Sequence, residues 1–131
     1  MREIGNDANY WAGLMAGELR LPQCADCETW YWPAPFRCAK CGSWDFSWKT
    51  IAPEGLIYSW TRVHHSFGGL ESFVMPFTTL CVELPQANGI RLFGLLDDGH
   101  APAIGAAVTA TIKATHIFDR DISALYWKHH E

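Results

Sequence analysis

Four cysteines in the N-terminal third of the chain have the spacing of metal ligands. They form two C-x2-C pairs, Cys24 with Cys27 and Cys38 with Cys41, and ten residues separate the pairs. Two residues between thiols allow both sulfur atoms of a tight turn to face one ion, and two such turns complete a tetrahedron with metal–sulfur distances of about 2.3 Å. Because thiolates fill all four positions, we expect a structural Zn²⁺ and not a catalytic one.

Other chemistries for these thiols fit the sequence less well. Disulfide bonds are typical of secreted proteins, and the opening segment MREIGNDANYW lacks the basic and apolar regions of a secretion signal, so we expect a cytoplasmic protein. A thioredoxin-like redox centre needs one C-x2-C pair in a βαβ context, which neither pair has. Iron remains the alternative metal. The fifth cysteine, Cys81, lies in the apolar run FTTLCVEL and is expected to pack as a small hydrophobic side chain.

Histidines and aspartates supply a second set of reactive groups. The candidates among them are the dipeptides His64-His65, Asp97-Asp98 and His129-His130. The first ends an expected strand, the second lies in a polar turn, and the third is expected to fray at the tail. We favour the interpretation that Asp97-Asp98 is a solvent-exposed turn. The alternative is that a histidine of the first dipeptide and an aspartate of the second form an acid–base pair. No nucleophile elbow, phosphate loop, HExxH motif or dinucleotide fingerprint is present, so we predict no catalytic residue.

A short helix is expected ahead of the cysteines, in the segment NDANYWAGLMAGEL. Tyr10 and Leu14, and likewise Trp11 and Met15, are four residues apart and form an apolar stripe. A helix of about two turns is too short to be stable alone. The stripe therefore packs either on the core of this chain or on another protein, and both interpretations stay open.

The segments around the cysteine pairs predict short strands. TWYWPAPF contains two prolines and is expected to be extended, while CGSWDFSWKTI leaves the second pair as a strand with Trp44, Phe46 and Trp48 on one face. Two cysteine turns with short strands and aromatic flanks indicate a rubredoxin-like zinc ribbon, and we assign residues 1–50 to it and the helix. Aromatic side chains that the ribbon does not bury would form a contact patch.

From residue 51 onward the pattern changes to short strands, as in the alternation of Leu80, Val82 and Leu84. The five strand-like segments are GLIYSWTRVHH, FVMPFTTLCVELP, GIRLFGLL, IGAAVTATIKATH and ISALYWKHH. They predict a small closed barrel over residues 51–131, for which the OB-fold is the natural five-stranded candidate. The chain is therefore expected to be mainly β.

The charge of the chain argues against nucleic acid as a partner. The 131 residues have a formal net charge of −4, and residues 51–131 contain five Lys or Arg against eight Asp or Glu. Phosphate neutralisation by basic residues supplies most non-specific affinity for nucleic acid. No apolar run approaches the roughly 20 residues of a transmembrane helix. We expect neither nucleic acid nor a membrane as a partner.

The order of these parts resembles a known family, the acyl-CoA-associated proteins with a zinc ribbon and an OB-fold (domain of unknown function 35). The resemblance covers nearly the whole chain and rests on Tyr10-Trp11, GELRLPQCADC, PAPFRCAKCGS, GLIYSWTRVHH and IGAAV. Three features depart from the family pattern: Glu28 replaces a usual glycine after the first cysteine pair, Ala39 replaces a common proline within the second, and PAPFRC is an altered form of the family's proline–arginine lead-in. None removes a metal ligand.

The resemblance implies an accessory role in lipid or steroid metabolism. Such proteins accompany thiolase-like acyltransferases, aldolases that cleave steroid side-chain CoA thioesters, or hotdog-fold hydratases, and the partner holds the nucleophile or base. We expect this chain to organise such a complex and to help admit the acyl-CoA. Aromatic residues dominate interface hot spots, so we expect the partner on the helix and the ribbon. The predicted contact residues are Tyr10, Trp11, Leu14, Trp30, Trp32 and Trp44.

Two alternatives from other classes remain. A single-stranded nucleic-acid-binding OB protein would use Tyr58, Trp60 or Phe93 as stacking platforms. A stand-alone acyl-CoA hydrolase or lyase would use His64 or His65. Co-purification from the native source discriminates among the three readings.

Overall fold

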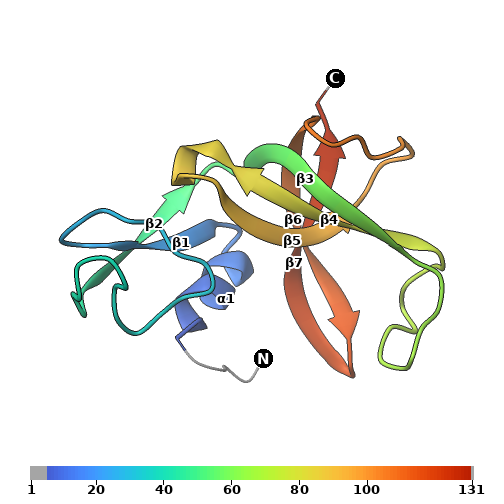
Figure 1. Cartoon of the computed structure of the whole chain (residues 1–131). Helices are drawn as coiled ribbons and strands as arrows, with labels where there is room; N and C mark the ends of the chain where they lie inside the picture. The colour runs from blue at the N-terminus through green and yellow to red at the C-terminus, as the bar shows by residue number, and fades with distance from the viewer. Residues whose placement is uncertain (1–5, 131) are drawn as a thin grey trace.

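The computed structural model describes residues 6–130. A short helix and a two-stranded sheet precede a closed five-stranded barrel (Figure 1). The elements are α1 (Ala8–Met15), β1 (Leu19–Cys24), β2 (Phe46–Ile51), β3 (Glu54–Val63), β4 (Phe77–Leu84), the 3-10 turn η1 (Pro85–Ala87), β5 (Ile90–Leu96), β6 (Ala107–Ile117) and β7 (Arg120–His129). The chain is mainly β, with a zinc ribbon followed by a barrel, as the sequence predicts.

The ribbon consists of the antiparallel strands β1 and β2 with the two cysteine turns at its far end (Figure 1). Leu19 pairs with Ile51 at the end next to the barrel, and Cys24 pairs with Phe46 at the end next to the cysteines. The segment between the cysteine pairs contains no helix, as its two prolines predict. This pairing brings the first cysteine turn beside the entry of β2.

The barrel closes in the order β3-β4-β5-β7-β6. All its pairings are antiparallel except that of β5 with β7, where Leu95 lies opposite Tyr126. This is the strand order of an OB-fold, and it confirms the predicted barrel. One irregularity lies between Ile57 and Ser59 of β3, where an extra residue, Tyr58, points outward.

One hydrophobic cluster joins the barrel to the helix and the ribbon. The barrel contributes alternating inward residues such as Leu80, Val82 and the fully buried Trp127. Tyr10 and Leu14 of α1 belong to the same cluster and are 6% and 2% exposed. The apolar stripe of the helix therefore packs on the core of this chain, which decides between the two interpretations that its spacing left open.

Two other features of the structure bear on the sequence predictions. His129 closes β7, paired with Val108 of β6, so the expectation that this dipeptide frays is wrong for His129.

The described residues contain no helix with the length and apolar character needed to cross a membrane.

Candidate metal centre

Each cysteine pair forms one tight turn of the same kind. In the first, the backbone N–H of Cys27 lies 3.5 Å from Sγ of Cys24, and in the second the N–H of Cys41 lies 3.4 Å from Sγ of Cys38. Both turns are completed by a residue with positive φ, which is 64° at Glu28 and 81° at Gly42. The first turn thus holds a glutamate in the conformation that glycine adopts most readily.

The two turns bring the four thiols into one cluster. The Sγ atoms of Cys24 and Cys41 lie 3.5 Å apart, as do those of Cys27 and Cys38, and all four lie within 4.8 Å of one another. A regular tetrahedron with metal–sulfur bonds of about 2.3 Å has edges of about 3.8 Å. All these cysteines are free of disulfide bonds, so the cluster fits a single metal ion held by four thiolates.

Two hydroxyl groups support the thiolate form of this cluster. The hydroxyl of Tyr31 accepts a hydrogen bond from the N–H of Ala39 (3.0 Å), so its own proton is donated to Sγ of Cys38 (3.1 Å). The pKa of the Cys38 thiol is lowered to about 6, and this bond is the largest cause. The hydroxyl of Thr29 lies 3.1 Å from Sγ of Cys27 and lowers that thiol's pKa. Metals bind the thiolate, so both contacts favour metal binding. No motif in the sequence marks either hydroxyl as a partner of the thiols.

The predicted partner-contact residues have very different exposures in the structure. Tyr10 and Leu14 are buried, and Tyr10 packs against Trp32 with ring centroids 4.2 Å apart. Trp11, Trp30 and Trp32 are half-buried against the core, and Nε1 of Trp11 donates to Asp7 (3.0 Å). Trp44 is 69% exposed, with the guanidinium of Arg37 5.5 Å from its ring centroid. Of the six residues, Trp44 presents the most accessible side chain.

The histidines and aspartates pair differently from the sequence expectation. His64 and His65 are exposed in the loop after β3, and Asp97 forms an ion pair with Lys113. Asp98 instead accepts hydrogen bonds from the backbone N–H (2.7 Å) and the ring Nδ1 (2.9 Å) of His129. The favoured reading of a solvent-exposed turn is therefore wrong for Asp98, which is half-buried.

Hydrogen bonds hold the carboxyl of Asp98 in its charged form. Burial alone would raise the pKa of the Asp98 carboxyl, but the hydrogen bonds from His129 and from the N–H of His100 outweigh it, and the pKa is lowered. Nε2 of His129 is buried without a hydrogen-bond partner among the described residues. A cavity of about 510 Å³ lies beside the pair and is lined by His100, Lys128 and His130 among others.

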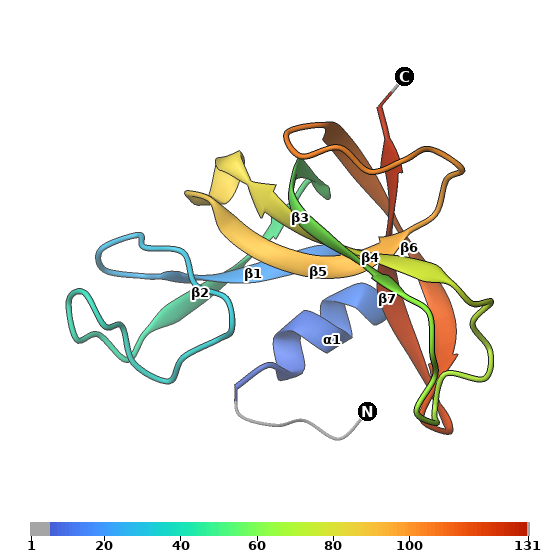
Figure 2. The same ribbon diagram turned by 45° about the vertical axis from the view of Figure 1, so that its right-hand side comes forward.

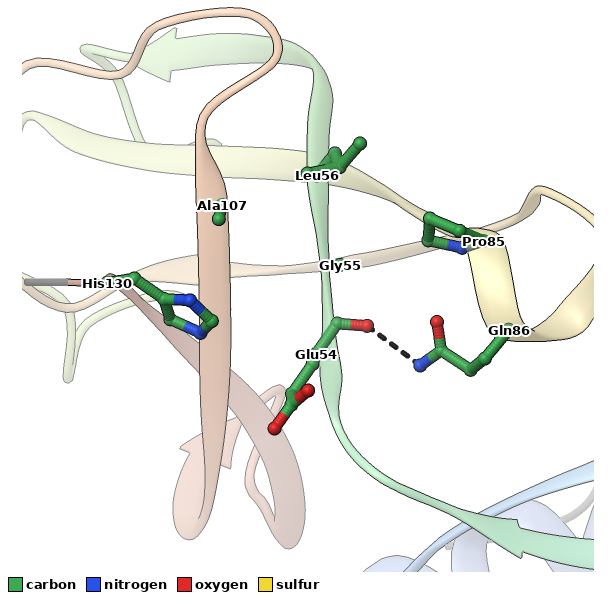
Figure 3. Close-up of a pocket in the computed structure, with 7 residues that line it drawn as sticks. All are labelled: Glu54, Gly55, Leu56, Pro85, Gln86, Ala107 and His130. Carbon is green, nitrogen blue, oxygen red and sulfur yellow. Dashed lines mark hydrogen bonds between the residues drawn. The ribbon is translucent and has the colours of Figure 1, made fainter.

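A smaller cavity of about 210 Å³ lies where β3, β6 and η1 meet (Figure 3). It is lined in part by Gln86, whose Nε2 donates to the backbone oxygens of Ala52 (3.0 Å) and Glu54 (2.9 Å). These bonds fix the start of β3 against η1, so we assign this cavity a structural role.

Comparison with known proteins agrees with this architecture. Residues 11–47 match the model of the family described as ChsH2, rubredoxin-like zinc ribbon domain. A curated relative from Thermomonospora curvata, described as a probable enoyl-CoA hydratase alpha subunit, is 30% identical over 98 residues, or 72% of this chain. The chain spans only 30% of the length of that relative.

Two solved structures are similar over most of the chain. One, described as an Ltp2-ChsH2(DUF35) aldolase, has a TM-score of 0.78 and 27% identity and covers 98% of both chains. The other is a protein of unknown function of the DUF35 family from Sulfolobus solfataricus, with a TM-score of 0.61 and 18% identity over 93% of this chain and 83% of that one. The latter shows the fold alone. Together with the zinc-ribbon match, the similarity to the first structure and to the curated relative supports assignment of the chain to the acyl-CoA-associated zinc-ribbon and OB-fold family, domain of unknown function 35.

Proposed function

We propose that this chain is an accessory subunit of a thiolase-like enzyme that acts on acyl-CoA, either an acyltransferase or an aldolase that cleaves a CoA thioester. The observation that carries the proposal is the match to a chain of the Ltp2-ChsH2(DUF35) aldolase, which extends over 98% of both chains. A match of that extent covers the ribbon, the helix and the barrel in one arrangement. The thiolase-like partner then holds the nucleophile or base, and this chain organises the complex and helps to admit the acyl-CoA.

We propose that Cys24, Cys27, Cys38 and Cys41 hold a structural Zn²⁺. The four thiols lie at the separations that a tetrahedral site requires. When bound, the metal supplies folding free energy by cross-linking the two cysteine turns. Tyr31 and Thr29 stabilise the thiolates by donating or sharing a proton at Sγ of Cys38 and Cys27. Because all four coordination positions are filled by thiolates, the metal has a structural role and holds the ribbon in its folded shape.

The ribbon end of the chain supports a partner contact. Trp44, with Arg37 beside its ring, forms an exposed aromatic and cationic pair at the second cysteine turn, and Phe36 is 62% exposed close by in the sequence. Trp and Arg are enriched at interface hot spots. Tyr10 and Leu14 are buried in the core, so we assign them the role of fixing the helix in place and not that of direct contact.

Co-purification from the native source tests this function. The tagged full chain should retain one protein in stoichiometric amount, and mass spectrometry should identify that protein as a member of the thiolase superfamily. The recombinant partner should then consume acyl-CoA faster when this chain is added. Acyl-CoA turnover by the isolated chain would instead support the stand-alone enzyme, for which the pair of Asp98 and His129 beside its cavity is the strongest candidate in the structure. Tightly bound RNA or single-stranded DNA would support the nucleic-acid reading.

A further inference from the structure

Two loops at the barrel end remote from the cysteine turns are joined by hydrogen bonds. The loop between β3 and β4 and the turn between β6 and β7 lie side by side, away from the ribbon (Figure 2). The N–H of Phe118 donates to the carbonyl of Gly69 (2.8 Å), and the hydroxyl of Ser72 donates to the carbonyl of His116 (2.6 Å). Gly69 has a φ of 85°, and a Cβ there would lie 2.0 Å from the Phe118 ring. The Phe118 ring packs directly on the backbone of Gly69, and this contact together with the hydrogen bonds keeps the two loops adjacent.

These two loops expose large apolar side chains. Phe67 is 95% exposed, Val74 is 84% exposed and Phe118 is 65% exposed. We call these three residues the loop surface. A cavity of about 400 Å³, lined in part by Glu71 and Phe118, adjoins it, and a second of about 390 Å³ is lined in part by Val74. Hydrogen-bonded loops that hold apolar groups in solvent beside two hollows are typical of a protein contact surface.

The charges around the loop surface restrict what can cover it. Its edge carries the carboxylates of Glu71, Asp119 and Asp121 against the single guanidinium of Arg120. The side chains of Asp119 and Asp121 are fully or largely exposed. The imidazole of His116 lies between these two aspartates, 2.9 Å from Asp121. An anionic membrane or nucleic acid would be repelled by this edge, and two copies of it would repel each other.

We propose that the loop surface docks a protein face that has an apolar centre and a rim of lysine or arginine residues. This inference rests on the proposed function, and it identifies the occupant as the thiolase-like partner subunit. Apolar side chains of the partner cover Phe67, Val74 and Phe118 and enter the two hollows. Basic side chains of the partner meet Glu71 and Asp119 at the edge. The ribbon of β1 and β2 lies on the opposite side of the molecule from these two loops (Figure 1), so this contact is separate from the ribbon contact proposed for Trp44.

Binding measurements with single substitutions in the full chain test this inference. Phe67→Ser and Phe118→Ser should each raise the Kd for the purified partner at least tenfold, which is the usual range for hot-spot residues. Glu71→Lys should also weaken binding, and raising the salt concentration should weaken wild-type binding. Phe67 is almost fully exposed, so its variant keeps the fold even if Phe118→Ser disturbs the packing on Gly69. The matched control is Phe93→Ser, which alters an aromatic residue that is 70% exposed on the side of the barrel and should change Kd less than twofold.

The outcomes separate this inference from the proposed function. If no thiolase-like protein binds the wild-type chain, the proposed function fails. If the partner binds but Phe67→Ser and Phe118→Ser leave Kd within twofold, the function stands and the loop surface is not the contact. Two other results overturn the inference: co-sedimentation with phosphatidylserine vesicles that Phe67→Ser abolishes, and a concentration-dependent dimer in sedimentation velocity that the same substitution dissociates.

Discussion

The hydroxyl oxygen of Tyr31 lies 3.1 Å from Sγ of Cys38 and donates a hydrogen bond to it. Residues that orient or polarise a metal ligand typically change metal affinity 10- to 100-fold when they are replaced. We predict that Tyr31→Phe lowers the affinity of the cysteine cluster for Zn²⁺ by about tenfold or more. Competition with a chromophoric chelator at pH 7 measures this change. Tyr58→Phe, on the outer face of the barrel, is the control and should leave the affinity unchanged.

Glu28 has a positive φ of 64° in the first cysteine turn, where the second turn has Gly42. The left-handed conformation costs a residue with a Cβ roughly 1–2 kcal/mol, while glycine loses more backbone entropy on folding. Glu28→Gly should therefore stabilise the metal-loaded protein by about 0.5–1 kcal/mol. The free energy of unfolding in urea, with zinc present, measures it.

The neighbouring Asp26 serves as the control for this substitution. Its φ is not positive, so Asp26→Gly adds flexibility without relieving strain and should be neutral or destabilising. Equal stabilisation by both glycines would contradict the strain argument.

Asp98 joins the loop after β5 to the end of β7 through its two hydrogen bonds to His129. The pKa of this carboxyl is lowered in the folded protein, so its contribution to stability is present above the unfolded value of about 3.9. That contribution is lost as the pH falls through the lower, folded pKa. Asp98→Asn should destabilise the protein by about 1–3 kcal/mol at pH 7.

The pH dependence provides the check on this assignment. The difference in unfolding free energy between wild type and Asp98→Asn should shrink as the pH falls below the folded pKa, and urea unfolding between pH 7 and pH 2 follows it. A difference that stays constant over this range would show that the carboxylate charge has no role. Asp97→Asn, whose carboxylate pairs with the more exposed Lys113, should have a smaller effect at every pH.

Substitutions at Leu14 and Trp44 separate residues that stabilise the fold from residues that bind the partner. Leu14 is 2% exposed and Trp44 is 69% exposed. Leu14→Ala should lower the unfolding free energy by about 2–5 kcal/mol, as large-to-small core substitutions do. Trp44→Ala should leave stability within about 0.5 kcal/mol and weaken the complex by about 2 kcal/mol, roughly thirtyfold in Kd. Thermal unfolding and titration calorimetry measure the two effects. A Trp44→Ala chain that binds as tightly as wild type would exclude Trp44 from the interface.

The parts of the structure that follow from local patterns could be predicted from the sequence. The spacing of Cys24, Cys27, Cys38 and Cys41 specifies two turns around one point, and the alternation of Leu80 and Val82 specifies a strand with one buried face. The helix could also be predicted, because its apolar residues are spaced four apart. What covers its apolar stripe could not, because a spacing of four residues is the same for a core face and for a docking face.

Features that depend on long-range pairing could not be read from the sequence. The contact of Asp98 with His129 spans 31 residues and forms only because β7 lies beside β5 when the barrel closes. Tyr31 reaches Cys38 across the turn between the cysteine pairs, and no motif marks it. The loop surface likewise depends on two turns that meet through Gly69 and Phe118, which lie far apart in the sequence.

The rate of acyl-CoA consumption by the isolated chain, the isolated partner and their equimolar mixture tests the central claim most directly. The account predicts no turnover by this chain alone, and a mixture that is faster or longer-lived than the partner alone. His65→Ala should leave the rate of the mixture within a few-fold, because the catalytic groups belong to the partner. Turnover by the isolated chain that His65→Ala or Asp98→Asn abolishes would contradict the accessory role, and so would a partner whose activity and stability are unchanged by this chain.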